Sequence, residues 1–104
     1  MSAERGISQL ADRGQGRCEI SGALTLESAP WLWKELQTAG LLSQARHADI
    51  SGVNAADSAG LALLLAWKAE CRRHGAELGF TGVPARLRAL AALTGAEKLL
   101  EASA

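Results

Sequence analysis

Residues 47–61 read HADISGVNAADSAGL, and this stretch decides the fold. Its first part, from His47 to Val53, is too short for a helix and runs into Gly52 and Asn54. A short apolar run bounded by turn residues is typical of a buried strand followed by a loop. Helix-forming residues follow almost at once. The stretch therefore predicts a central strand, a loop and the start of a helix.

The segment from Ser58 to His74 is predicted to form one helix. It contains no proline and is rich in alanine and leucine, while Asp57 or Ser58 can act as N-cap and Gly75 can end it. At about 100° per residue, one arc carries the residues that we expect to face the core. They are Gly60, Leu63, Leu64, Trp67 and Cys71. A glycine in this arc would let the helix approach the sheet closely.

The opposite arc of this helix is also largely apolar, with charges only in the last turn. Its members are Ser58, Leu61, Ala62, Leu65, Ala66, Ala69, Arg72 and Arg73. An ordinary surface helix carries charge along its whole outer face, so this arc indicates a docking surface for another protein. The candidate partner-binding residues are Ser58, Leu61, Ala62, Leu65 and Ala69. The alternative is that a later helix or the N-terminal segment covers Leu61 and Leu65.

The segments before this stretch predict a hairpin and then a helix. Two strand-like runs between Ile7 and Ser21 flank the turn residues Gly14-Gln15-Gly16. From Glu27 to Ala39, apolar residues at helical spacing include Trp31, Leu32 and Leu36. Thr25 or Ser28 can cap this helix and Gly40 can end it.

The segments after the long helix predict a strand and a further helix. Residues Ala76 to Thr81 alternate as a strand does, and Pro84 then opens a helix that Gly95 ends. Leu87, Leu90 and Ala91 lie on one side of that helix, and a last helical turn runs from Glu97 to Ala102. Strands alternating with helices imply an α/β fold: a mixed, mostly parallel sheet opened by a β-hairpin, with helices packed on one face.

Bulk composition narrows the class of protein. The 104 residues, 48% hydrophobic and 21% charged, fit one domain over residues 1–104. The formal net charge is zero, so a nucleic acid is not an expected partner. No secretory signal or membrane-spanning run is visible, which predicts a cytoplasmic protein. Cys18 and Cys71 are far apart in sequence and are expected to be reduced and buried, without a metal or a disulfide.

Nothing in the sequence resembles a catalytic site. The histidines are His47, in a strand, and His74, near a helix end, and no other titratable group clusters with Asp49 and Asp57. A phosphate-binding glycine loop is missing, so we expect no enzyme activity, no cofactor and no metal. The three tryptophans, Trp31, Trp33 and Trp67, are interpreted as core residues in preference to a lipid site.

The runs Asp49–Val53 and Asp57–Leu61 resemble the signature of STAS domains, the sulfate-transporter and anti-sigma-factor-antagonist family. The resemblance covers essentially the whole chain, because the hairpin, the Trp33-containing helix and the closing Gly82-Val83-Pro84 segment follow in the expected order. It implies a STAS-like single domain that works by binding a partner protein.

Within the family, the tract Gly60–Leu65 is similar to the small STAS subunits of Mla-type phospholipid ABC transporters. That resemblance implies a partner, the cytoplasmic ATPase of such a transporter, within a complex with an inner-membrane permease. It also implies a role in maintaining outer-membrane lipid asymmetry. The chain would then lie peripheral to the inner membrane through its partner, without inserting directly.

The anti-sigma-factor antagonists are the competing relatives. In them a partner kinase phosphorylates the serine of the Asp-Ser motif, a position that Ser58 occupies here. A phosphate at a helix N-terminus meets free backbone amides and would block a dry interface. The simpler interpretation of Asp57 and Ser58 is that one of them only caps the helix.

Overall fold

The computed structural model describes residues 8–100. Within this range four strands form one sheet in the order β1-β2-β3-β4. Their bounds are β1 Gln9–Gly14, β2 Arg17–Leu24, β3 His47–Ala56 and β4 Gly79–Thr81. Strand β1 runs antiparallel to β2, and β2, β3 and β4 run parallel to one another. The predicted mixed, mostly parallel sheet opened by a hairpin is therefore confirmed.

The hairpin turn depends on backbone that glycine tolerates. Gly14, Gln15 and Gly16 all have positive φ, at 84°, 57° and 78°. Most residues avoid this region, which glycine adopts without steric cost. The glycines on either side of Gln15 thus make the tight reversal possible. The expected start of the hairpin at Ile7 lies outside the described residues.

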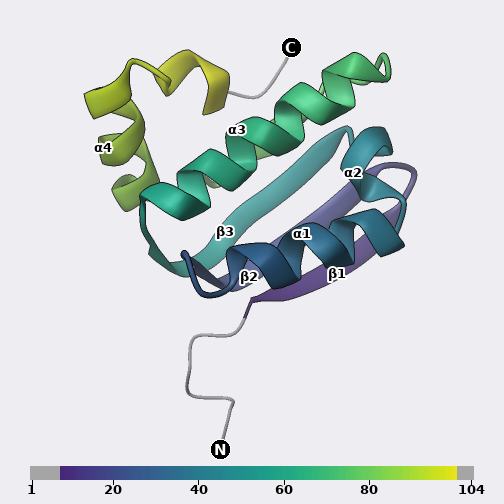
Figure 1. Ribbon diagram of the computed structural model, residues 1–104, viewed down its shortest axis with the longest axis horizontal. Coiled ribbons are helices and arrows are strands. Elements are labelled where there is room, and N and C mark those ends of the chain that lie inside the picture. The colour runs from purple at the N-terminus through teal and green to yellow at the C-terminus, as the bar shows by residue number, and fades with distance from the viewer. Residues whose placement is uncertain (1–7, 101–104) are drawn as a thin grey trace, which may run out of the picture.

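The helices lie over one face of the sheet (Figure 1). Their bounds are α1 Ala29–Thr38, α2 Leu41–Gln44, α3 Ser58–Arg73, α4 Ala85–Thr94 and the 3-10 helix η2 Glu97–Leu100. Side chains alternate across β3, so Ala48 and Ile50 are buried under the helices while Asp49 and Ser51 stay partly or fully exposed on the other face. The expectation of helices on a single face is confirmed.

The core lies between this covered face and the helices. Ile20 and Ile50 of the sheet are fully buried together with Leu32 of α1 and Leu64 of α3. Trp67 is the largest buried side chain, and its indole Nε1 donates a 2.9 Å hydrogen bond to the carbonyl oxygen of Leu41. A buried indole N–H needs a hydrogen-bond acceptor, and the first residue of α2 supplies it for Trp67.

The structure differs from the sequence-based prediction in its element ends. Helix α2 was not expected, because its four residues are too few to show a period. Strand β3 extends to Ala56, and β4 is shorter than the predicted Ala76–Thr81. The predicted turn after Glu97 is described as far as Leu100, and its last two residues, 101–102, lie outside the described range.

Ser28 occupies the N-cap position of α1, but its hydroxyl does not cap that helix. It donates a 3.0 Å hydrogen bond to the Ala23 carbonyl and accepts one from the Thr25 amide, also at 3.0 Å. The side chain therefore folds the loop between β2 and α1 onto itself. This loop passes directly beside the start of α3.

Candidate functional site

The candidate site lies where β2 and β3 end and α3 begins. In a parallel sheet the carboxyl ends of the strands share one edge, and the helices that follow start there. The amide of Asp57 donates a 3.2 Å hydrogen bond to the carbonyl of Leu24, the last residue of β2. This bond brings the first turn of α3 against the loop after β2.

Asp57 is the N-cap of α3, which decides between the two capping candidates. Its Oδ1 accepts hydrogen bonds from the amides of Ala59 at 2.9 Å and Gly60 at 3.1 Å, and its Oδ2 accepts one from the Leu26 amide at 3.1 Å. The pKa of this carboxyl is lowered, first by the Leu26 hydrogen bond and then by those from Gly60 and Ala59 and the charge of Arg86. One ionised side chain thus holds both the helix end and the neighbouring loop.

Gly60 makes the close packing of α3 on the sheet possible, as its place in the predicted core arc required. A β-carbon at this position would lie 1.9 Å from the carbonyl oxygen of Leu24. No real contact is that short. The start of α3 can therefore approach β2 only because residue 60 has no side chain.

Ser58 is the first residue of α3 and is exposed. Across the described part of the chain, its hydroxyl makes no hydrogen bond, because Asp57 already occupies the amides of the first turn. Ala62, Ala66 and Ala69 continue the exposed face along the helix. Leu65 is half-buried and packs partly against the core.

The prediction that Leu61 faces a partner is wrong, because this side chain is only 4% exposed. Leu61 belongs to the same buried core as Leu87 and Ala91 of α4, a helix that contacts α3. Lys68, seven residues further, is also buried, and its Nζ donates to the carbonyl of Leu78. The alternative that the protein itself covers Leu61 therefore holds for this residue, and the buried arc of α3 is wider than its period suggested.

Leu26 was not predicted as a site residue, yet its backbone lies against the N-cap of α3. Its side chain is 71% exposed, and the hydrogen bond to Asp57 fixes its backbone there. The only sequence signal was a leucine between the turn residues Thr25 and Ser28. We use the name α3 surface for the patch formed by Leu26, Ser58, Ala62, Leu65 and Ala69.

The remaining polar candidates belong to separate local networks. His47 Nε2 and the Thr81 hydroxyl share a 3.0 Å hydrogen bond, and Asp49 accepts one from the Ser51 amide at 2.9 Å. His74 contacts the backbone of its own helix at Glu70. Among residues 8–100, no group of three metal-ligating side chains comes together.

The cysteines and tryptophans are placed largely as expected. Cys18 and Cys71 are free thiols inside the core, and burial raises the pKa of Cys18 to about 12. Trp67 is fully buried, and Trp33 packs partly against the core. Trp31 is 43% exposed, so its interpretation as a core residue is wrong. It lines a hollow together with Gln9 and Leu10 of β1.

Comparison with known proteins agrees with this fold. The family model described as the STAS domain of MlaB matches residues 8–101. The solved structure of the anti-sigma factor antagonist SpoIIAA in its unphosphorylated form matches with a TM-score of 0.70 and 15% sequence identity. That match covers 93% of this chain and 88% of the other. No curated protein matches the sequence. Between residues 8 and 100, no helix is long and apolar enough to cross a membrane.

Proposed function

Because this chain belongs to the STAS-domain family, we propose that it is a non-catalytic subunit that binds the cytoplasmic ATPase of a bacterial Mla-type phospholipid ABC transporter. The observation that carries this proposal is the match of the MlaB model to residues 8–101, almost the full chain. In this role the protein has no reaction of its own. It supports the ATPase by occupying one surface of it.

The α3 surface supports the proposal physically. Ser58, Ala62 and Ala69 are exposed, and the charged side chains of this helix face, Arg72 and Arg73, come only in its last turn. Burying such a surface removes apolar area from water at about 25 cal/mol per Å² without desolvating a charge. The exposed Leu26 beside it provides an apolar anchor of the kind that fills a pocket on a partner.

The complex that we propose includes an inner-membrane permease and maintains the lipid asymmetry of the outer membrane. The chain would reach the inner membrane only through the ATPase, from the cytoplasmic side. The chain contributes only a surface that binds the ATPase. Its effect on transport should therefore depend on the affinity with which it binds.

Co-expression with the ATPase of such a transporter tests the proposal. We expect the two chains to co-purify in a fixed ratio during size-exclusion chromatography. Ala62→Glu should abolish the complex, because it places an unpaired charge in the centre of the α3 surface. Ala89→Glu, a matched change at an exposed position of α4, should leave the complex intact. Separate elution of the two wild-type chains at micromolar concentrations would contradict the proposal.

A second candidate function is that of an anti-sigma-factor antagonist regulated at Ser58. Two observations favour it: the SpoIIAA fold and the exposed Ser58 hydroxyl, for which no hydrogen bond is found within residues 8–100. A phosphate there would add almost two negative charges beside the Asp57 carboxylate, within the α3 surface. The addition would oppose docking of an apolar partner.

Phosphorylation assays separate the two candidates. The second function requires a sigma-regulatory kinase that binds the chain and phosphorylates it at Ser58, with no transfer to Ser58→Ala. The first function requires that Ser58→Ala still bind the transporter ATPase. Binding of the kinase alone would favour the antagonist, and binding of the ATPase alone would favour the transporter subunit.

A further inference from the structure

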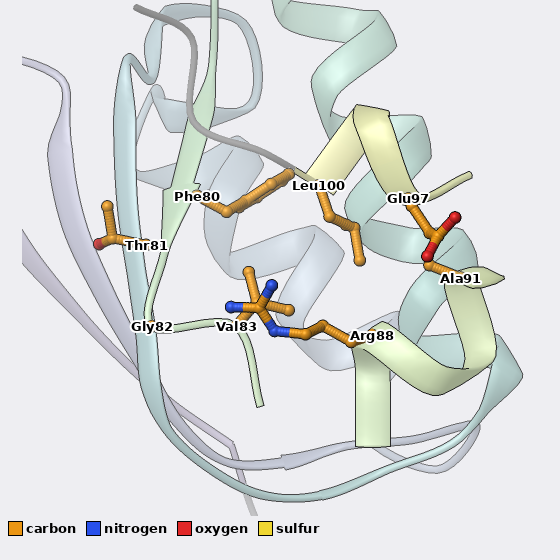
Figure 2. A pocket seen from close by; sticks show the side chains of 8 residues that line it. All are labelled: Phe80, Thr81, Gly82, Val83, Arg88, Ala91, Glu97 and Leu100. Atoms are coloured by element: carbon orange, nitrogen blue, oxygen red, sulfur yellow. The ribbon is translucent and has the colours of Figure 1, made fainter. Parts of the chain in front are cut away.

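A hollow of about 600 Å³ beside β1 has apolar surface that a partner can reach. Trp31 of α1 lines it with a side chain that is 43% exposed, and Leu10 of β1 lines it half-buried. The hollow between β4, α4 and η2 is different (Figure 2). Its lining residues Phe80, Ala91 and Leu100 are at most 3% exposed, so a ligand could not lie against them. Only the hollow beside β1 therefore presents a large apolar side chain to solvent.

Strand β1 is an edge of the sheet in the part of the chain that the structure describes. In an antiparallel pair, every second residue turns its N–H and C=O away from the neighbouring strand. The stretch Gln9–Asp12 pairs regularly with β2, so two of its residues offer main-chain groups outward. Charges and bulges protect many sheet edges from further pairing. In β1 the bulge comes after Asp12 and the charges begin there, which leaves Gln9–Ala11 open to another strand.

Helix α1 contacts β1 and adds two side chains, Trp31 and Glu35, to this hollow (Figure 1). They are four residues apart on the helix, a spacing that places β-carbons about 5–6 Å from each other. Within residues 8–100, Glu35 forms no ion pair. An indole face attracts a cation, and a carboxylate forms a strong hydrogen bond with one. The pair is therefore suited to the ammonium of a lysine or the guanidinium of an arginine.

The charge around the hollow is negative. Its charged lining residues are Arg13, Glu19, Glu35 and Asp49. Arg13 and Glu19 form a 2.9 Å ion pair with each other. Across the described residues, Glu35 and Asp49 have no such counter-charge. A surface with this excess of carboxylates attracts a basic partner and repels an acidic one.

A second copy of this chain fits the β1 edge poorly. Leu10 is opposite the buried Ile20, and Asp12 is opposite the buried Cys18. Directly opposite residues share a face, so Asp12 lies on the side of the sheet that α1 covers. Two β1 strands paired about a two-fold axis would bring both copies of Asp12 and of Glu35 to that one side. Like charges placed together in this way oppose the pairing.

We infer that the β1 edge, Gln9–Asp12, binds an extended segment of another protein that has lysine or arginine at alternate positions. The segment adds as a strand outside β1 through main-chain hydrogen bonds. One of its cationic side chains lies against the Trp31 indole and the Glu35 carboxylate. The basic residues alternate because side chains on one face of a strand are two residues apart. The inference does not depend on the proposed partner, because the hollow and the α3 surface share no residue.

An acetylated and amidated hexapeptide of alternating threonine and lysine is the probe. Titrated into the ¹⁵N-labelled full chain, it should give saturable shifts of the Gln9–Asp12 amides and of the Trp31 indole, and it should slow hydrogen exchange of the outward amides. Glu35→Gln should weaken binding about fivefold by removing the counter-charge. Trp31→Leu, which keeps an apolar side chain without an aromatic face, should weaken it about threefold. Glu97→Gln, a matched loss of charge on η2, should leave the affinity unchanged.

Two further probes separate strand addition from simple attraction of charge. The same peptide with glutamate in place of lysine should not bind, and lysine amide, which cannot pair as a strand, should bind about tenfold more weakly or worse. Binding of either probe as tight as that of the lysine peptide would overturn the inference. So would wild-type affinity in both Trp31→Leu and Glu35→Gln. Sedimentation of the free chain tests the other occupant, because a dimer in which the Gln9–Asp12 amides are already protected would assign the edge to a second copy.

Discussion

The side chain of Asp57 and the backbone of Leu26, thirty-one residues apart in sequence, are joined by a 3.1 Å hydrogen bond. The same carboxylate caps α3 through the amides of Ala59 and Gly60. The loop after β2 and the first turn of α3 are therefore positioned by one residue. Since both contribute to the α3 surface, its shape depends on Asp57.

Asp57→Ala should lower the free energy of unfolding by about 1–2 kcal/mol, because loss of an N-cap alone costs that much. It should also shift the NMR signals of the Leu26 amide. Urea unfolding measures the first effect. Asp49→Ala is the control, since that carboxylate accepts a hydrogen bond from the amide of Ser51 and caps no helix. Equal losses in the two variants would mean that Asp57 does not join the loop to α3.

The lowered pKa of Asp57 predicts a dependence of stability on pH. Its folded pKa lies below the ordinary value of 3.8, so the unfolded chain binds the proton more readily. The stabilisation is present above the unfolded pKa and is lost as the pH falls through the folded pKa. Asp57→Asn keeps a capping oxygen but cannot ionise.

The free energy of unfolding of the wild-type protein relative to Asp57→Asn should therefore decrease between about pH 5 and pH 2. Urea unfolding at several pH values measures this difference. Asp49, whose pKa is also lowered, is present in both proteins and drops out of the comparison. A difference that stays constant across this range would contradict the assigned pKa shift.

The local sequence predicted α3 well. Its helical spacing of apolar residues, its N-cap and the glycine that ends it all lie in one continuous segment. The predicted core residues Gly60, Leu63, Leu64, Trp67 and Cys71 are all buried. Leu61 shows the limit of that reasoning. A period gives the order of side chains around a helix, but the width of the covered arc depends on what packs against it. Here Leu61 joins a buried core whose other members come largely from distant parts of the chain.

Leu26 and Trp31 show the same limit on the exposed side. Both are large apolar residues whose exposure depends on contacts that no local window contains. Leu26 is held in place by a carboxylate from a different element, so neither spacing nor composition could place it. The part of the candidate site at the start of α3 was predicted from the Asp57-Ser58 pair. The position of Leu26 could be known only from the three-dimensional structure.

Gly60→Ala should be strongly destabilising, by about 3 kcal/mol, because its β-carbon would overlap the Leu24 carbonyl and force α3 away from β2. Thermal or urea unfolding measures this. Gly95→Ala is the matched change at a helix end with positive φ, where nothing lies within 4 Å of the added carbon. It should cost only about 1 kcal/mol. A mild effect at Gly60 equal to that at Gly95 would show that the helix can move away from the sheet.

The neighbours Leu61 and Ala62 provide the sharpest separation between folding and binding. Leu61 is buried in the core, whereas Ala62, one residue later, is exposed in the centre of the α3 surface. Leu61→Ala should lower the free energy of unfolding by about 2–4 kcal/mol through the cavity that it leaves. Ala62→Glu should change it by about 0.5 kcal/mol or less, as surface substitutions do.

Binding should show the reverse order. At a temperature where both variants are folded, Leu61→Ala should keep most of the affinity for the partner, because its side chain never reaches the α3 surface. Ala62→Glu should lose that affinity, since the glutamate would be buried without a partner charge. Calorimetric titration with the purified ATPase, on samples whose folding is verified by circular dichroism, compares the two. If Leu61→Ala lost binding while Ala62→Glu retained it, the partner would have to contact the buried side of α3, and the α3 surface as defined here would not be the binding site.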